Sequence, residues 1–443
     1  MLKNLLKKKK YFYLLKYFIE KIFLDRKIFS NFKNCIIIFR KIYKVNINNI
    51  FIYKIYSGLN WCKYHKNKYL ITFEEKIPFQ VPIVFNKFLK NKKLFTKKRV
   101  NFVTNINDAS IFGSSDIVIS KNSIINEAVG DTEYGKFASL DYENMVLDHT
   151  YKKAIINLNS YKKTKIIDKG IYLCGLTSRA WGHWYPEYLS KLFSLKKSEY
   201  FDNFPLIVNS NLPRSHIDSL KYFLGKKKII NIKDDEIFKC KNLIYSPCPS
   251  WFPSKVNNLE YIKSSEPYFH SWSPFSLHYI KSEIEKKLKK KIKKNYFLKI
   301  YLSRKSSNWG KLNNEEKIIN LLKKENYIIL DTSVLSFEKQ LKFFKRAEII
   351  VAPAGSALNN LIFCNKNVKI IILCNNNYFY WGAFCGPLQK LGYKNFLILP
   401  ENYTKNIRDK HENYDIDINK LIDCTKNFKK YIRSYNIINY RND

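Results

Sequence analysis

The stretch that decides the fold is Ile349-Ile-Val-Ala-Pro-Ala-Gly-Ser-Ala-Leu-Asn-Asn-Leu-Ile-Phe363. Its first apolar residues predict a buried strand, which Pro353 ends. Gly355 permits an unusual backbone turn, and Ser356 can cap a following helix. Such an arrangement brings backbone N–H groups and the positive end of a helix dipole to one point, which suits a phosphate or another anion. Many α/β proteins use this turn only to reverse the chain, so the neighbouring segments must decide.

Those neighbouring segments alternate between strand and helix. Strands are predicted at 296–302, 327–330 and 368–374, with helices at 313–322 and 337–344 between them. This succession predicts a Rossmann-like unit over residues 295–405. Ligands of such sheets lie at the carboxyl ends of strands, and Arg304 and Gly355 each follow one.

The remaining chain divides into three parts by its sequence pattern. Residues 51–294 have short strand-like runs up to about 170 and then alternate between strand and helix from 204 to 232, which predicts a β-rich and Rossmann-like half. Residues 1–50 form a basic extension, and residues 406–443 a helical tail. The basic run 285–294 is typical of a solvated helix face.

A second segment with candidate chemistry begins at Trp181-Gly-His-Trp-Tyr-Pro-Glu187. Pro186 predicts the first turn of a helix, with His183 at its mouth and Glu187 just inside it. A His beside a carboxylate can act as a general base. The spacing alone favours the alternative, in which His183 caps the helix or bonds the backbone.

The N-terminal extension is both basic and apolar, with thirteen Lys or Arg against two acids, Glu20 and Asp25. Apolar residues from Leu14 to Phe23 recur at helical spacing. Two alternatives fit this pattern: a helix lying in a membrane interface, or a helix packed on the protein with a solvated Lys face. No run reaches the roughly 18–20 apolar residues of a membrane span, and the start lacks a secretory signal. We therefore expect a cytoplasmic protein, which the first alternative would place peripherally on the inner face of the membrane.

Composition narrows the class of protein further. The chain has 443 residues, a net charge of +42 and 46% hydrophobic residues, so it is long enough for two folded domains. Such a charge attracts anionic partners, but a nucleic-acid-binding protein would leave the strand-end features unexplained. The nine Cys are irregularly spaced and the seven His scattered, which favours reduced buried thiols and no metal cluster.

The ordered motifs resemble glycosyltransferase family 61, the capsular-polysaccharide type. They are His183-Trp-x-x-Glu187, Leu302-Ser-Arg304, Asn314-Glu315, Ser336-Phe-Glu-Lys-Gln340 and Gly355-Ser-Ala-Leu-Asn-Asn360, followed by Phe363. The likeness covers residues 150 to 400. It implies a GT-B architecture, with two Rossmann-like domains facing across a cleft, and inverting transfer from a nucleotide sugar to a glycan or lipid-linked acceptor. No metal and no cofactor beyond that co-substrate are implied.

The resemblance also implies roles for individual residues. His183 is the candidate base that takes the acceptor proton, supported by Glu187. The departing diphosphate would be neutralised by cations and backbone dipoles; the candidates are Arg304, Lys311, Gly355 and Ser356. Contacts with nucleotide or sugar fall to Glu315, Asn359 and Asn360, although Asn360 could equally bridge structurally and Glu315 serve the helix dipole.

Two positions depart from the family pattern. Ala354 stands where the family commonly has His, and Lys311 stands where the family has a second Arg. A lysine keeps the positive charge but cannot make the bidentate hydrogen bonds of an arginine. The first departure keeps open a glycosyltransferase-like protein without activity. A metal enzyme using Asp415-Ile-Asp417 is not favoured, because this D-x-D lies near the C-terminus, outside the Rossmann pattern.

Overall fold

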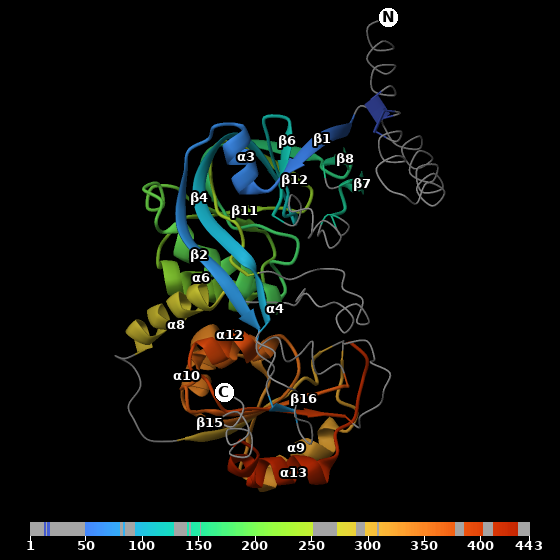
Figure 1. The fold of residues 1–443 in the computed structure, drawn as a ribbon, viewed down its shortest axis with the longest axis vertical. Helices are drawn as coiled ribbons and strands as arrows, with labels where there is room; N and C mark the ends of the chain where they lie inside the picture. The colour runs from blue at the N-terminus through green and yellow to red at the C-terminus, as the bar shows by residue number, and fades with distance from the viewer. Residues whose placement is uncertain are drawn as a thin grey trace, which may run out of the picture.

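The structure, a computed structural model, describes residues 13–14, 16–17, 49–79, 83–84, 94–127, 140, 143–150, 152–250, 273–288, 297–307, 310–376, 385–401 and 411–432. Two β-sheets with helices around them make an α/β protein. In Figure 1 the first sheet, drawn in blue and green, lies in the upper lobe, and the second lies in the orange and red lower lobe. We call these the first lobe and the second lobe.

The second lobe is built on a parallel sheet in the order β14 (Ile328–Leu330), β13 (Leu298–Leu302), β15 (Ala347–Pro353), β16 (Lys369–Cys374), β17 (Phe396–Pro400) and β3 (Ile83–Val84). Its helices are α9 (Glu315–Lys324), α10 (Phe337–Lys345), η7 (Ser356–Phe363) and α12 (Cys385–Lys390). The strand order reverses between β13 and β15. Such a switch point is where open α/β sheets bind ligands.

The sequence explains why these elements form. The strands β15 and β16 are nearly continuous apolar runs, as expected for parallel strands buried on both faces. In α10, Ser336 caps the N-terminus by accepting from the Lys339 N–H, and Phe337, Leu341 and Phe344 are buried at helical spacing. The strands and helices predicted from 296 to 374 agree with the structure to within a few residues.

The first lobe holds an eleven-stranded mixed sheet, in the order β11-β10-β9-β12-β4-β5-β6-β1-β8-β7, with β2 paired to β4. The bounds are β1 Ile50–Tyr56, β2 Tyr69–Phe79, β4 Leu94–Phe112, β5 Val118–Ser120, β6 Ser123–Ile125, β7 Val146–His149, β8 Lys153–Asn157, β9 Lys163–Tyr172, β10 Leu206–Asn209, β11 Ile229–Ile232 and β12 Glu236–Tyr245. Its longer helices are α3 (Gly58–Tyr64), α6 (Arg214–Leu224) and α8 (Pro274–Leu288).

Only part of the first sheet matches the predicted Rossmann-like pattern. The four strands β9 to β12 are mutually parallel, and their order reverses between β9 and β12. The pairs β12·β4, β4·β5, β1·β8 and β7·β8 are antiparallel. The pairs β4·β5 and β7·β8 are joined by short connections, which suffice for antiparallel pairing, whereas β12·β4 and β1·β8 bring together segments far apart in the chain. The prediction of a Rossmann-like half therefore holds only for the segment from β9 to β12.

Two segments bear on the predicted division into domains. Residues 83–84 were expected in the 51–294 domain, yet β3 pairs with β17 in the second sheet, with Ile83 opposite Leu397. Residues 406–443 were expected to form a helical tail, and the helix α13 (Ile418–Lys426) within them packs into the second lobe. Its Leu421 and Cys424 share an apolar core with Ile318 and Leu322 of α9. An amphipathic helix is stable only where its apolar face is covered, which α9 provides.

One apolar core spans the two lobes, in addition to the cores that lie within each of them. Tyr185 of the first lobe meets Phe363 of the second at 5.3 Å between ring centroids, edge to face. Phe337 lies 5.6 Å from Tyr222 in the same way. Edge-to-face aromatic contacts add to burial. The lobes are therefore joined over an extended hydrophobic contact.

Four residues in the first half of the N-terminal extension, 13–14 and 16–17, are described, as are residues 49–50 at its end. Leu14 and Tyr17 are buried, and the Tyr17 hydroxyl donates to Asp148 Oδ2 at 3.1 Å. This turn follows the second alternative, a helix packed on the protein; the rest of the extension lies outside the described residues. None of the helices that the structure describes has the length and hydropathy needed to cross a membrane. Eight cysteines are described, and seven of them are buried.

Candidate active site

Arg304 and Gly355 meet at the switch point of the second sheet. Arg304 follows β13 and Gly355 follows its neighbour β15. The Arg304 guanidinium donates from Nη1 to the Ala354 carbonyl at 2.6 Å and from Nη2 to Ser307 Oγ at 2.8 Å. Burial lowers the pKa of Arg304, and Tyr414, Glu315 and Tyr301 raise it; the guanidinium stays charged at neutral pH. A fixed positive charge therefore lies at this strand end.

The reason for the glycine differs from the prediction. Gly355 has φ 165° and ψ −175°, an extended conformation open to any residue, so no unusual turn occurs. A Cβ at this position would lie only 1.3 Å from Arg304 Nη1. Glycine is needed because the guanidinium packs against the backbone there. The following helix is a short 3-10 helix, η7, which the Ser356 side chain does not cap; Ser356 is exposed.

Glu315 supports Arg304 from behind. The carboxylate is 6% exposed, and its Oε1 accepts from the Arg304 backbone N–H at 2.8 Å and from the Tyr301 hydroxyl at 3.1 Å. Glu315 therefore fixes the turn after β13 and is not open to a sugar. Lys311 lies in the same loop with an exposed side chain, and its backbone N–H donates to Asn413 Oδ1 at 2.9 Å.

In the first lobe, His183 and Glu187 form a pair. Their Nδ1 and Oε1 atoms are 3.2 Å apart, and their side chains are 32% and 11% exposed. The single regular helix expected from Pro186 is instead four short turns: α4 (Trp181–His183), a π-helix η4 (Trp184–Tyr188), a 3-10 helix η5 (Leu189–Lys191) and α5 (Leu192–Leu195). π-helical turns are frequent at functional sites. This segment leaves the first sheet just after β9, at its own switch point.

The two candidate segments contact each other through Asn359 and Asn360. Asn359 Nδ2 donates to the carbonyls of Trp181 and Gly182, both at 3.0 Å. The Trp181 indole donates to Asn360 Oδ1 at 3.0 Å, and Asn360 Nδ2 donates to Gln340 Oε1 at 2.9 Å. Both asparagines are fully buried. We assign Asn360 the structural bridge that the sequence left open, and Asn359 the same role, in place of a direct ligand contact.

The site therefore has two neighbouring parts. A Cβ added to Gly182 would lie 3.3 Å from Ser356 Cβ, so the backbone beside His183 lies against the start of η7. The structure brings Arg304, Gly355 and Glu315 together on one side, and His183 with Glu187 on the other. Lys311 lies in the loop bonded to residues 413–414.

Two further carboxyl groups lie behind Glu187. Asp116 Oδ1 accepts from the Tyr188 hydroxyl at 3.0 Å, and the Asp116 N–H donates to Glu143 Oε1 at 2.7 Å. Burial and, to a smaller extent, the nearby Asp116 charge raise the pKa of Glu143 to about 8. Burial also raises the pKa of Asp116; the Lys191 charge lowers it and the Glu187 charge raises it. Glu143 is thus protonated at neutral pH.

The D-x-D near the C-terminus has a structural explanation. Asp417 caps α13 by accepting from the N–H groups of Asn419 and Lys420. Asp415 Oδ2 accepts from Asn313 Nδ2 at 2.8 Å. Across the described part of the chain, no three His, Cys, Asp or Glu side chains are grouped so that they could hold a metal ion.

Sequence reasoning missed Trp181, Gln340 and the buried Lys281. Trp181 stands two residues before His183, but an aromatic residue there gives no sign of its bond to Asn360. Gln340 of α10 fixes the loop that precedes this helix, by donating from Nε2 to the carbonyls of Thr332 and Leu335. Lys281 belongs to a helix whose Lys-rich end suggested a solvated face. The signal available was its position beside Leu277, Ile280 and Ile284, within the apolar stripe.

The second sheet, its switch point and the basic residue seated there define an α/β protein of the doubly wound type. Residues 181–371 match the family described as Glycosyltransferase 61, which supports the assignment of this region to that family. The match begins at Trp181 and includes Arg304 and η7. It supports a glycosyltransferase in general. A search among curated proteins found no match.

Proposed function

We propose that this protein is an inverting, metal-independent glycosyltransferase of GT-B type, which moves a sugar from a nucleotide sugar to a glycan or lipid-linked acceptor in surface polysaccharide synthesis. One observation carries the proposal: a guanidinium seated on a glycine at the switch point of a parallel sheet, beside a His–carboxylate pair from the other lobe. The family match supports the reaction class.

On the donor side, Arg304 faces the departing diphosphate. A buried guanidinium stabilises developing negative charge more strongly than an exposed one, because little water screens it. Backbone N–H groups at the start of η7 and the exposed Lys311 add positive potential. Gly355 lets the guanidinium lie flat on the backbone, and Glu315 holds the Arg304 N–H in place.

On the acceptor side, His183 is the base. Its Nδ1 faces Glu187, so Nε2 is the nitrogen that takes the proton of the acceptor hydroxyl. The carboxylate fixes the tautomer and stabilises the imidazolium that forms. The freed oxygen attacks the anomeric carbon as the bond to the diphosphate breaks, and the electron pair leaves with the diphosphate. Attack opposite the leaving group inverts the configuration.

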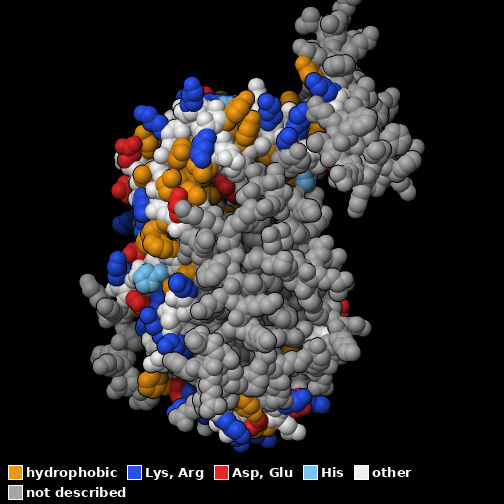
Figure 2. Space-filling model, viewed as in Figure 1, with side chains coloured by type: hydrophobic (Ala, Val, Ile, Leu, Met, Phe, Trp, Pro, Cys, Tyr) orange, Lys and Arg blue, Asp and Glu red, His pale blue; other side chains and the backbone are white. Residues whose placement is uncertain are grey.

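A lipid-linked acceptor requires contact with a membrane, and the first lobe has a fitting surface. Tyr64, Leu70 and Ile71 are 61%, 51% and 47% exposed, with Lys63, Lys66 and Lys68 exposed between them. We call residues 63–71 the basic-apolar edge. Figure 2 presents this part of the molecule with orange and blue side chains interspersed over α3 and β2. Exposed apolar groups flanked by Lys suit an anionic membrane interface.

The test is a thermal-shift screen of nucleoside diphosphates and nucleotide sugars, followed by transfer assays with those that bind. We expect binding that Arg304→Ala weakens and transfer that EDTA leaves intact. Binding unchanged in Arg304→Ala would remove the proposed diphosphate role. Ala354, buried and without a polar side chain, favours a second candidate, a family member that binds donors without transferring sugar. Turnover with any donor would exclude it.

A further inference from the structure

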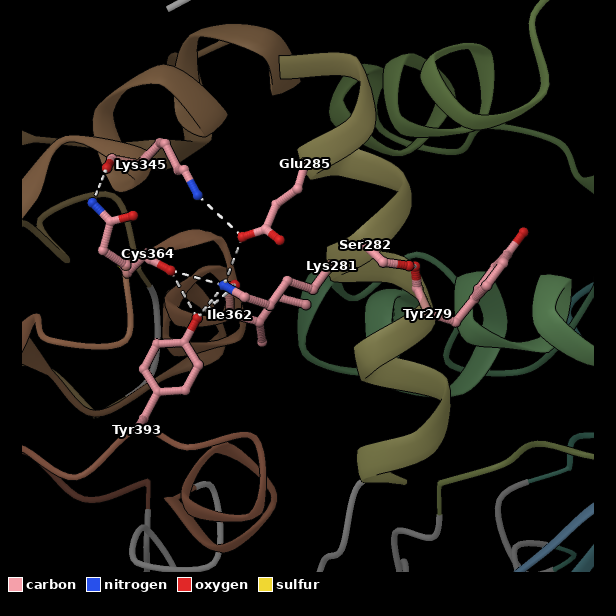
Figure 3. Close-up of polar contacts among 9 residues, drawn as sticks. Tyr279, Lys281, Ser282, Glu285, Lys345, Ile362, Cys364 and Tyr393 are labelled. Carbon is pink, nitrogen blue, oxygen red and sulfur yellow. Dashed lines mark hydrogen bonds and ion pairs between the residues drawn. The ribbon is translucent and has the colours of Figure 1, made fainter. Parts of the chain in front are cut away.

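A buried lysine lies at the far end of η7 from the candidate site. Lys281 belongs to α8, and it is 6% exposed. Figure 3 shows its side chain reaching from α8 toward the second lobe, while Tyr279 and Ser282 of the same helix point the other way. Lysine is almost never buried to this extent unless its charge is paired. Its partners should therefore reveal what the burial achieves.

The Lys281 ammonium uses its three N–H donors on the second lobe. It donates to the carbonyls of Ile362 and Cys364, both at 2.9 Å, and to the Tyr393 hydroxyl at 2.7 Å. Glu285, one turn further along α8, lies 3.5 Å away. The same carboxylate pairs with Lys345 of α10 at 3.0 Å. This network satisfies the carbonyls at the end of η7, and a cation at that end complements the helix dipole.

The helix η7 is thus held both by the first lobe and by α8. Midway along it, Asn359 donates to the carbonyls of Trp181 and Gly182, beside His183. At its end, Lys281 binds Ile362 and Cys364. The helix α8 is itself attached to the first lobe, where Phe275 stacks on Phe73 of β2 at 5.3 Å. A shift at the Lys281 end would therefore move η7 relative to His183.

We propose that Lys281 is a positioning residue that sets the register between the two lobes, and so the placement of His183 opposite the Arg304–Gly355 strand end. The catalytic part of this inference rests on the proposed function. Donor contacts lie within the second lobe, so Lys281 affects donor binding little. Transfer needs groups from both lobes, and a misplacement of about 1 Å can cost on the order of a hundredfold in rate.

The structural part is tested without substrate, by amide hydrogen exchange on the full chain. In Lys281→Met we expect exchange to rise about tenfold in peptides covering 355–366 and also in those covering 178–190, since the substitution removes hydrogen bonds from a charged donor that join α8 to the end of η7. Lys281→Arg keeps the charge and should restore protection. Lys286→Met, a control on the exposed face of α8, should change neither segment. An increase confined to 361–366 would overturn the proposal.

The catalytic part is tested with UDP and GDP as probes and with any donor found in the screen. We expect Lys281→Met to lower kcat at least tenfold, with probe affinity within about twofold of wild type. Equal losses in affinity and kcat would indicate a merely structural role and overturn the assignment. If no probe binds wild type, the proposed function fails while the exchange result stands. If Lys281→Met does not fold, Tyr393→Phe is used instead. It removes the hydroxyl that accepts from Lys281 and donates to the carbonyls of Ile362 and Cys364, and it must give the same exchange pattern.

Discussion

The two lobes place their candidate residues by different means. In the second lobe, Arg304 and Gly355 directly follow neighbouring parallel strands, and the register of β13 and β15 sets their separation. In the first lobe, His183 lies on a succession of short irregular turns, and buried side-chain contacts with η7 hold it in place. Regular strand pairing makes the arrangement in the second lobe local and robust. The position of His183 in the first lobe depends on contacts with the second lobe, so it should respond to distant changes.

The largest expected effect separates the roles of the lobes. His183→Ala should lower transfer by about 10²–10⁴-fold, because general base catalysis contributes that much, while nucleoside diphosphate affinity stays unchanged. Glu187→Gln keeps a polar contact with His183 but removes the carboxylate that stabilises the imidazolium, so it should lower transfer less than His183→Ala does. Single-turnover rates and equilibrium binding measure the two quantities. Loss of binding in His183→Ala would contradict the proposal that the second lobe binds the donor and the first lobe supplies the base.

Substitutions at Arg304 should act on the other quantity, the affinity for nucleoside diphosphates. Arg304→Ala should weaken UDP or GDP binding by about 10–100-fold, since bonds to charged groups contribute roughly 1.5–3 kcal/mol each. Arg304→Lys should recover only part of the affinity, because lysine lacks the planar fork that bonds Ala354 and Ser307. Titration calorimetry measures both. Full affinity in Arg304→Lys would argue that charge alone matters there.

Two glycines form a matched pair across the lobe contact. Gly355→Ala should match Arg304→Ala in lost affinity, because the new Cβ would lie 1.3 Å from Nη1 and displace the guanidinium. Gly182→Ala should cost at most about threefold, since its nearest contact is Ser356 Cβ at 3.3 Å. Both are measured by the same titration with UDP or GDP. Equal behaviour of the two variants would contradict the packing argument.

A smaller effect is expected at the basic-apolar edge of the first lobe. Leu70→Glu with Ile71→Glu should weaken binding to vesicles of 30% phosphatidylglycerol in phosphatidylcholine by about tenfold, because the membrane no longer buries two apolar side chains. Val334→Glu in the second lobe, 79% exposed, is the control and should bind as wild type does. Co-sedimentation measures the binding. Equal loss in the control would mean that the overall charge governs membrane contact.

The smallest effect concerns Glu143 in the first lobe, whose pKa is raised from an ordinary value of 4.5 to about 8. The native state retains a proton that the unfolded state loses, so this group's stabilisation is complete below about pH 4.5 and declines as the pH rises to about 8. Glu143→Gln should remove that decline, raising Tm at pH 8 relative to wild type by a few degrees. Thermal unfolding from pH 5 to 8 measures it. A pH-independent difference would contradict the assignment.

Local sequence pattern was sufficient for the second lobe and insufficient for the first. Apolar runs and caps identified β13 to β16 and α10, because parallel strands buried on both faces leave a strong local signature. The first sheet mixes parallel and antiparallel pairs that depend on distant partners, such as β12 with β4. The motifs selected Arg304, His183 and Glu187 as candidates, and their roles remain predictions. They could not reveal that Glu315 and Asn360 face inward, since burial is set by packing with segments far along the chain.

The short strand β3 has a consequence for how the protein can be divided and made. Ile83 pairs with Leu397, so the second sheet takes its edge strand from a segment synthesised long before the rest of that sheet. During translation, residues 83–84 have no partner in that sheet until β17 has left the ribosome. Pairing over such a separation is slow, because loop-closure entropy opposes it. A fragment starting at residue 295 would leave the β17 edge uncovered, and an exposed strand edge invites aggregation.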